Sequence, residues 1–377
     1  MTAKVVLLGA TGHTGRLTAE QLVARGISPV LAGRRRGPLE TLATQLGGLQ
    51  TAVADVERPR TIRELLEPGD VLITTVGPFA RFGDPVAAAA VEAGAIYFDT
   101  TGESSSLRRV FEHHGPAASR TGAALIPAFG YDYVPGNLAA AQALDEAGPA
   151  AVRVDVAYFM YPGAFPLGKM SGGTRASLAI ALLDPSYGYR HGRLVTERGG
   201  RTLRRFEIDG RSRPAISFGT SEPLTLPQTH PHLREINTYL GWFGGVSRVM
   251  QVAGLANEPV LAIPGARELL KRGVAKLVRG STGGPPATTP DQTPSRFVAI
   301  AYDEHGLPLA ARRFRGPDGY AFTCRLMAAG AAHAAEHGVE GTGALGPVRA
   351  FGADRLEQLC SEAGLADLER RPEAVAR

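Results

Sequence analysis

Three glycines near the start of the chain, Gly9, Gly12 and Gly15, have the spacing of a phosphate-binding turn. An apolar run at residues 4–8 precedes them, and a stretch with helical character follows. Such a turn leaves backbone N–H groups unpaired at the start of the helix, where the helix dipole adds about half a positive charge. A pyrophosphate fits there. The other loop residues that we expect at the phosphates are Thr11, His13 and Thr14.

The three glycines have separate tasks in this interpretation. Gly9 permits the tight turn, Gly12 lets the backbone approach the phosphates, and Gly15 lets the helix pack closely on the strand. The spacing is GxxGxxG rather than GxGxxG, so a purely structural turn is the alternative. A second strand and helix expected between residues 27 and 46 favour nucleotide binding.

Arginines follow the second expected strand, about 20 residues after the loop, where an NAD-binding fold usually carries an acidic residue. This chain has Arg34, Arg35 and Arg36 there. Guanidinium groups pair with a ribose 2′-phosphate, which a carboxylate would repel. The sequence therefore predicts NADP(H) as the cofactor, and a solvated basic turn is the alternative.

Strand and helix patterns alternate through the first 130 residues, which predicts an α/β fold with a Rossmann-type parallel sheet and helices on both faces. The carboxyl ends of parallel strands meet at one edge, so the residues that follow each strand should lie together there. The six expected strands are residues 5–8, 30–32, 51–54, 71–74, 96–99 and 123–127.

Two further segments at this edge are candidates for binding the cofactor. Asp55 follows the third strand and is expected either to meet the adenine or to cap a helix at residues 59–66. A Gly-Pro pair stiffens the turn after the fourth strand. We interpret this turn as a wall for the nicotinamide, and a purely structural turn is the alternative. The residues of this wall are Val76, Gly77, Pro78 and Phe79. After the fifth strand, a polar loop at residues 99–103 opens another helix.

Composition limits the class of protein. The 377 residues, 44% of them hydrophobic and 20% charged, suffice for two globular domains. No signal peptide is expected because the chain runs directly into a strand. The most apolar region, residues 239–266, is interrupted by charges and prolines and so predicts no transmembrane span. Cys324 and Cys360 lack metal-ligand spacing, so we expect no metal site and a reducing, cytoplasmic environment.

The formal net charge of +5 comes mostly from arginine. Basic residues cluster at 190–213, but acids and glycines interrupt them and few aromatic residues lie between, so no nucleic-acid partner is expected. We interpret this segment as a solvated hairpin face.

The second half of the chain shows strands, one helix and one irregular segment. Alternation at residues 151–161 predicts a half-buried strand, and residues 297–300 and 307–314 predict a β-hairpin. Ser171 is a good N-cap for a helix that ends near residue 183. The segment 280–294 is rich in Gly, Pro and Thr, which predicts a mobile surface loop.

Several motifs together resemble the saccharopine-dehydrogenase-like oxidoreductases. They are GATGHTG at residues 9–15, AGRR at 32–35, TTVGPFARFGDPV at 74–86, AGAIYFDTTGE at 93–103 and GYDYVPGN at 130–137. The SGGT of residues 171–174 resembles the trans-acting enoyl reductase branch, which works beside modular polyketide synthases in actinobacteria. Residues 316–364 look like the C-terminal end of that branch. One departure is Tyr133, where many relatives have serine.

The resemblance implies a Rossmann domain, an inserted mixed α/β domain for the substrate, and a final helix that returns to the first domain. We place the NADP-binding domain at residues 1–135 and its returning helix at about 345–377. The inserted domain then covers residues 136–344. It is expected to bind the substrate and to carry the contacts of a homodimer if one forms.

Hydride transfer from NADPH needs a reduced nicotinamide about 3–3.5 Å from an electrophilic carbon, together with a proton donor. The candidates for catalysis are Tyr133, Lys169 and Tyr131. Lys169 would serve as an acid if burial lowered its pKa, and a surface lysine is the alternative. For the two tyrosines, a place in the pocket wall is favoured over proton donation.

These features predict an NADPH-dependent reductase of an enoyl thioester or a related conjugated carbonyl or imine, in polyketide, lipid or other secondary metabolism. The alternatives are a reductase of amino-acid-derived imines or keto acids and a non-catalytic NADP sensor. Short-chain dehydrogenase catalysis is excluded because no lysine has a tyrosine four residues before it. The substrate is expected to be a small molecule or an acyl group on an acidic carrier protein, for which residues 190–213 offer a basic docking face.

Overall fold

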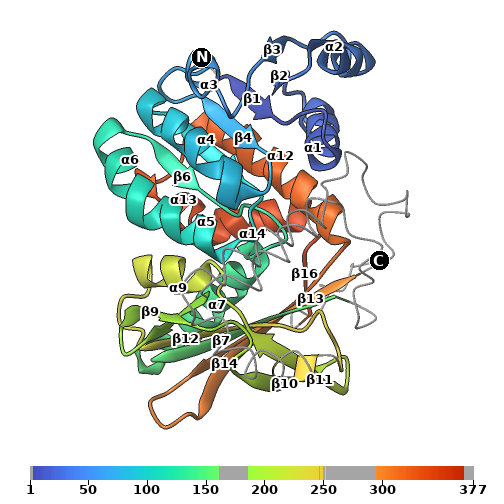
Figure 1. Cartoon of the computed structure of the whole chain (residues 1–377). Helices are drawn as coiled ribbons and strands as arrows, with labels where there is room; N and C mark the ends of the chain where they lie inside the picture. Colours follow the sequence, from blue (N-terminus) through green and yellow to red (C-terminus); the bar gives the residue numbers. More distant parts are fainter. Residues whose placement is uncertain (1–2, 161–185, 246, 249–250, 252–293, 369–377) are drawn as a thin grey trace.

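The computed structural model describes residues 3–160, 186–245, 247–248, 251 and 294–368. It contains two β-sheets, in the upper and lower halves of Figure 1, with helices packed between them. Lys169, the helix expected at 171–183 and the loop expected at 280–294 lie outside the described residues.

The first sheet is parallel throughout, with strand order β15-β6-β5-β4-β1-β2-β3. All six predicted strands are confirmed, with small differences at their ends. Most are short apolar runs whose residues are buried on both faces of the sheet, as a parallel sheet between helices requires. The strands are β1 (Val5–Leu8), β2 (Val30–Gly33), β3 (Thr51–Val53), β4 (Val71–Thr74), β5 (Ile96–Asp99), β6 (Ala124–Ile126) and β15 (Gly343–Ala344).

Helices cover both faces of this sheet, which confirms the Rossmann-type architecture. One hydrophobic cluster joins one face of the sheet to α3, α4 and α6, and a second cluster joins the other face to α1, α2 and α12. The helices of this half are α1 (His13–Ala24), α2 (Arg36–Gln45), α3 (Arg60–Arg63), α4 (Phe79–Ala93), α5 (Ser104–Arg109), the π-helical turn η1 (Val110–His114) and α6 (Gly115–Thr121), and α12 (Gly319–His337) returns from late in the chain.

The second sheet is mixed and has the strand order β10-β11-β12-β7-β13-β14-β16, with β8 paired to β12 and β9. Strands β12 and β7 are parallel, and the other neighbours are antiparallel. The predicted strand at 151–161 and the predicted hairpin are confirmed as β7 and β13–β14. The strands are β7 (Arg153–Met160), β8 (Ser186–Arg190), β9 (Arg193–Glu197), β10 (Leu203–Ile208), β11 (Arg211–Ser217), β12 (Glu235–Leu240), β13 (Ser295–Tyr302), β14 (Pro308–Gly316) and β16 (Ala366–Asp367).

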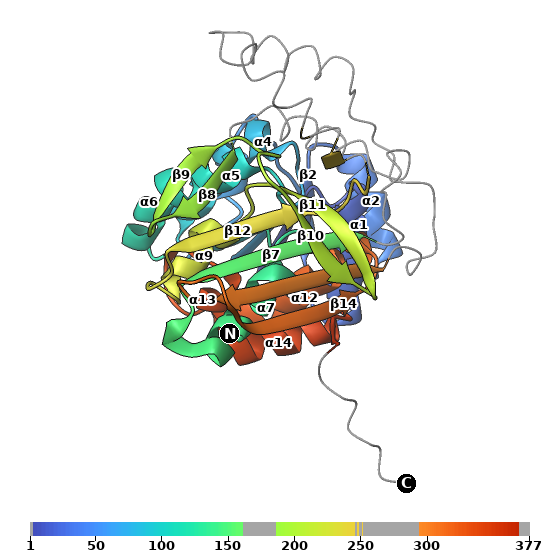
Figure 2. The ribbon, with the colours of Figure 1, turned by 90° about the horizontal axis from the view of Figure 1, so that it is seen from below.

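Helix α7 (Val134–Ala147) fixes the second sheet against the first. It packs on β7, β13 and β14, and Figure 2 shows it behind the face of that sheet. One hydrophobic cluster therefore runs from Leu7 in the first sheet to Val156 in the second. The remaining short helices are η2 (Gly148–Ala150), α9 (Glu222–Thr225), η4 (Leu226–Gln228), α13 (Pro347–Phe351) and α14 (Ala353–Glu362).

Three segments near the C-terminus do not follow the domain boundaries expected at residues 135 and 345. Helix α12 packs on α1, and β15 extends the first sheet, although both precede residue 345. Strand β16 follows that position and pairs with β14 of the second sheet. In place of one returning helix there are α13 and α14, because Gly352 interrupts the helix with a positive φ of 72° and Gly364 ends it with a φ of 104°.

No helix within the described part of the chain has the length and apolar character needed to cross a membrane. Within the same residues, His, Cys, Asp and Glu side chains form no group suited to a metal ion.

Candidate cofactor and active site

The glycine loop between β1 and α1 has the close packing that its three glycines require. Gly9 has a φ of 85°, and a Cβ there would lie 2.8 Å from Thr75 Oγ1. A Cβ on Gly15 would lie 2.2 Å from the Gly9 carbonyl oxygen, so α1 packs against the end of β1 only without a side chain. At Gly12 a Cβ would approach only that same oxygen, at 3.2 Å. Gly12 is exposed and forms the open side of the loop.

The start of α1 differs from the starts of two neighbouring helices. The Asp318 carboxylate accepts hydrogen bonds from the first turn of α12, and Glu103 does so for α4. In the described structure, α1 has neither a side-chain cap nor an acidic residue in its first turn. Its first amides and its dipole are therefore available to an anion, as a dinucleotide pyrophosphate requires.

His13 begins α1 and places the start of α12 beside the loop. Its ring meets that of Tyr320 edge to face, with centroids 5.3 Å apart. Burial lowers the pKa of His13, and the nearby Asp318 opposes this shift. The imidazole is therefore neutral near pH 7 and suited to a hydrogen bond with phosphate. Thr11 and Thr14 are half-buried in the same loop.

The arginines that follow β2 are exposed at the same edge of the sheet. Arg36 lies 3.8 Å from Glu40 on α2. Within the described residues, neither Arg34 nor Arg35 forms an ion pair. Because β2 is next to β1 in the sheet, these two guanidinium groups fit a 2′-phosphate on an adenosine held at the glycine loop.

Asp55 lies in the turn between β3 and α3. Its carboxylate accepts a hydrogen bond from the Glu57 amide at 3.1 Å and lies 3.8 Å from the Arg58 guanidinium. The side chain thus stabilises the turn, and contact with the adenine stays a prediction.

The predicted nicotinamide wall lies between β4 and α4. Thr75, just before it, donates its amide to the Leu8 carbonyl at 3.1 Å, which keeps the turn beside the glycine loop. Val76, Gly77 and Pro78 lead into α4, whose first residue is the buried Phe79. The Glu103 carboxylate binds the first two amides of that helix. Glu103 is a site residue that sequence reasoning missed, although the polar loop that carries it was recognised.

The loop after β6 brings Tyr131 and Tyr133 to the junction of the two sheets. Both side chains are buried, and burial raises the pKa of each hydroxyl well above its usual range. The Tyr133 hydroxyl donates to the Gly102 carbonyl at 2.9 Å, and the Tyr131 ring packs 5.4 Å from that of Phe297. These contacts favour a place in the wall for both tyrosines. Asp132 lies between them and was not singled out from the sequence.

Two fully buried carboxyl groups belong to the same region. Asp99 accepts hydrogen bonds from the Ala128 amide at 2.7 Å and from the Tyr97 hydroxyl at 2.7 Å, and burial raises its pKa to about 6. Glu222 accepts a hydrogen bond from Tyr158, and burial raises its pKa to about 7. Neither carboxyl forms an ion pair within the described part of the chain, so the junction is rich in acids and phenols.

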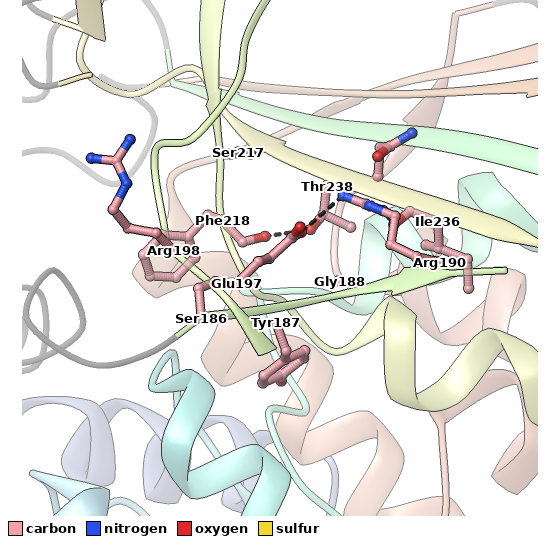
Figure 3. A pocket seen from close by; sticks show the side chains of 11 residues that line it. Ser186, Tyr187, Gly188, Arg190, Glu197, Arg198, Ser217, Phe218, Ile236 and Thr238 are labelled. Carbon is pink, nitrogen blue, oxygen red and sulfur yellow. Dashed lines mark hydrogen bonds and ion pairs between the residues drawn. The ribbon is translucent and has the colours of Figure 1, made fainter. Parts of the chain in front are cut away.

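A small polar cavity lies under the hairpin β8–β9 (Figure 3). Its volume of about 10 Å³ accommodates about one water molecule. The Arg190 guanidinium binds Glu197 at 2.8 Å beside it. Arg201 and Arg204 of the basic segment are also paired, with Glu197 and Asp155. Figure 3 shows Tyr187 pointing away from this pair, toward the helix below.

Comparison with known proteins agrees with this geometry. Residues 5–152 match the family model of the saccharopine dehydrogenase NADP binding domain. The chain is 30% identical over 401 residues, 94% of either chain, to the Mycobacterium tuberculosis protein Rv2449c, which is provisionally named a trans-acting enoyl reductase. A trans-acting enoyl reductase of Mycobacterium ulcerans is 38% identical over 141 residues. That match covers 36% of this chain and only 34% of the relative's length.

A solved structure shares the fold. The apo saccharopine dehydrogenase (L-Glu forming) of Saccharomyces cerevisiae aligns over 97% of this chain and 98% of its own, with a TM-score of 0.60 and 16% sequence identity. The family match and the relative of nearly full length agree with the resemblance seen in the sequence. The chain therefore belongs to the saccharopine-dehydrogenase-like oxidoreductases that include the trans-acting enoyl reductases, and its residues 5–152 are the family's NADP-binding domain.

Proposed function

We propose that the protein is an NADPH-dependent reductase of the carbon–carbon double bond of an enoyl thioester. The observation that carries the proposal is the 30% identity to Rv2449c across nearly the whole of both chains. A shared N-terminal domain alone would support cofactor binding only, whereas this match includes the second sheet.

The residues of the first sheet fit the cofactor. The uncapped start of α1 would bind the pyrophosphate, Arg34 and Arg35 the 2′-phosphate, and residues 76–79 the nicotinamide. NADPH, when bound, supplies the hydride. The chain's own residues orient the two reactants, exclude water with buried aromatic rings and supply a proton.

The charged groups at the junction of the two sheets help to distinguish between the candidate substrates. Saccharopine-type chemistry acts on an imine flanked by carboxylates, which several converging arginines would have to bind. The groups described around Tyr133 are carboxyls and phenols instead, which suit an uncharged acyl chain. Reduction of an amino-acid-derived imine or keto acid is therefore the second candidate, supported by the shared fold. A non-catalytic sensor would bind NADPH without oxidising it.

We also propose that the acyl group arrives on an acidic carrier protein. Arg193, Arg205 and Arg211 are exposed on the hairpins β8–β9 and β10–β11. Changing all three to glutamate should lower kcat/KM for a carrier-bound substrate, because encounter with an acidic carrier would be repelled. Turnover of a small soluble thioester should not change. Equal effects on the two substrates would remove the carrier from the proposal.

Absorbance of the reduced nicotinamide tests the function directly. The purified protein would be mixed with NADPH and, in turn, with enoyl thioesters of increasing chain length, cyclic imines and keto acids. We expect oxidation of NADPH with enoyl thioesters and the saturated thioester as product. Turnover with imines alone would favour the second candidate, and NADPH binding without any turnover would favour the sensor.

A homodimer and a cytoplasmic location also belong to the proposal. Both cysteines are buried free thiols, which suits a reducing compartment. Sedimentation of the purified protein would test the dimer.

A further inference from the structure

We propose that Asp132 is the proton donor of the reductase, an assignment that rests on the proposed function. Asp132 is in the turn between β6 and α7, at the carboxyl edge of the first sheet. A Cβ on Gly102 would lie 3.1 Å from its Oδ2 and 4.0 Å from the Tyr133 hydroxyl. The carboxyl therefore lies against the loop after β5, at a position where Gly102 has no side chain.

That loop connects Asp132 to the expected position of the nicotinamide. Gly102 is followed by Glu103, whose carboxylate binds the amides of Phe79 and Ala80. The wall of residues 76–79 and the Asp132 carboxyl are thus fixed to two neighbouring residues of one loop. A substrate held between the wall and the second sheet would have this carboxyl beside it.

Four other carboxyl groups lie near the junction and are unsuited to the task. One of them, Asp318, accepts hydrogen bonds from the first turn of α12. Asp99, Glu103 and Glu222 are 0%, 1% and 0% exposed, and each accepts hydrogen bonds that fix neighbouring loops or Tyr158. Asp132 is half-buried as a residue, which makes it more exposed than these three. Among the described residues it has neither a hydrogen bond nor an ion pair that would occupy its oxygens.

The buried environment of Asp132 favours its protonated form. Burial raises the pKa of Asp132 to about 7. Three tyrosines interact with the Asp132 carboxyl, namely Tyr131 and Tyr133 of the same turn and Tyr158 of β7. These tyrosines interact in turn with Tyr187 of β8, Glu222 of α9, Glu103 after β5 and Asp318 before α12.

The chemical step balances with this donor. Hydride from NADPH forms a C–H bond at the β-carbon, and the electron pair of the double bond moves to the α-carbon and the thioester carbonyl. The α-carbon then takes the proton of Asp132, whose O–H bond breaks. NADP⁺, the saturated thioester and an Asp132 carboxylate result, and solvent returns the proton to the carboxylate. A neutral donor also avoids repulsion of the negative charge that develops on the substrate.

The test compares the wild type with Asp132→Asn, which is nearly the same size and cannot donate this proton. In the wild type, kcat should fall above about pH 7, because the donor must be protonated. In the variant, kcat should fall about 10²–10⁴-fold. KM and NADPH affinity, measured by fluorescence, should stay unchanged. The matched control is Asp145→Asn, at a side chain of α7 that is 63% exposed, and it should leave all three values unchanged.

A second readout needs no turnover. In the cofactor-free protein, ¹³C NMR of labelled aspartate should show a carboxyl that titrates near pH 7 in the wild type and is absent from the variant. One outcome would overturn the assignment of Asp132 but leave the proposed function standing. In that outcome the wild type reduces enoyl thioesters, and the variant keeps both the wild-type kcat and its decline at high pH. If wild type and variant both bind NADPH and neither reduces any enoyl thioester, the proposed function fails, and the donor assignment with it.

Discussion

The carboxylate of Glu103 accepts a hydrogen bond from the backbone amide of Phe79 at 2.9 Å. Its other oxygen binds the next amide, that of Ala80, at 2.7 Å. Glu103 follows β5 and Phe79 follows β4, so one buried side chain fastens two neighbouring loops at the sheet edge. A carboxylate at a helix N-terminus is stabilised by the helix dipole. The position of residues 76–79 therefore depends on a residue from another loop.

Glu103→Gln should destabilise the protein and weaken NADPH binding. Glutamine keeps one acceptor but loses the charge, and a buried cap of this kind contributes about 1–2 kcal/mol. Urea denaturation would measure the loss of unfolding free energy, and fluorescence titration the affinity. Glu92→Gln, at an exposed position of the same helix, is the control. Equal effects of the two substitutions would contradict a fastening role for Glu103.

Alanine at two loop glycines should give two different results. Gly15→Ala would bring a Cβ against backbone atoms of residues 9 and 10, so the free energy of unfolding should drop by about 1–3 kcal/mol or more. Gly12→Ala would bring its Cβ near a single atom, the Gly9 carbonyl oxygen at 3.2 Å, so it should cost less stability than Gly15→Ala. Its methyl group would lie where phosphate approaches, which lowers NADPH affinity. Gly37→Ala, with open space around it in α2, is the control. Thermal melts and NADPH titrations would separate the two effects.

Loss of the two free guanidinium groups after β2 should change cofactor preference. We expect the double variant Arg34→Ala and Arg35→Ala to bind NADPH about 10–100-fold more weakly, because a charged hydrogen bond contributes about 1.5–3 kcal/mol. NADH affinity should not change, since NADH has no 2′-phosphate. Arg60→Ala removes an exposed arginine paired with Glu64 and serves as control. Parallel losses for NADPH and NADH would refute selective phosphate binding.

Glu222 should make stability depend on pH. Burial raises its pKa to about 7, above the value of about 4.3 for an unfolded chain. The folded protein thus holds a proton that the unfolded chain has released. The resulting contribution to stability is complete below the unfolded pKa and is lost as pH rises through the folded pKa. Between about pH 5 and 8, the unfolding free energy of the wild type should fall relative to that of Glu222→Gln.

Urea denaturation at a series of pH values would measure this difference. Glu336→Gln, at a side chain that is 70% exposed, should keep the wild-type slope. Parallel curves for the wild type and Glu222→Gln would show that the carboxyl has an ordinary pKa in the folded protein.

Tyr133→Phe should show whether Tyr133 is part of the pocket wall or is the proton donor. Loss of the hydrogen bond to the Gly102 carbonyl should cost about 1 kcal/mol of stability, which a thermal melt would detect. If the ring is a wall, kcat and its pH profile should stay as in the wild type. A loss of kcat as large as that expected for Asp132→Asn would return the role of proton donor to the phenol.

Much of the fold could be predicted from the sequence because its signals are local. The strands of the first sheet are short apolar runs, and the residue types of the glycine loop alone predict its turn. Strand β15 could not be recognised, since two residues, Gly343 and Ala344, have no pattern of their own and become a strand only beside β6.

The site was harder to predict because its key contacts join distant segments. Glu103 caps a helix that begins 24 residues earlier, and no local motif shows this. Tyr133 stood out because the family resemblance leads us to expect a serine at this position. The environment of Asp132 depends on Tyr158, which lies in the other sheet.

The pairing of β15 with β6 also affects how the chain folds while it is being synthesised. Residues 343–344 form an edge of the sheet that binds the dinucleotide, and α12 covers one of its faces. During synthesis from the N-terminus, the nucleotide-binding half cannot complete its sheet until most of the chain has left the ribosome. The exposed edge of β6 would meanwhile be open to wrong partners. Nascent chains stalled before residue 343 should therefore depend on chaperones more than the finished protein does.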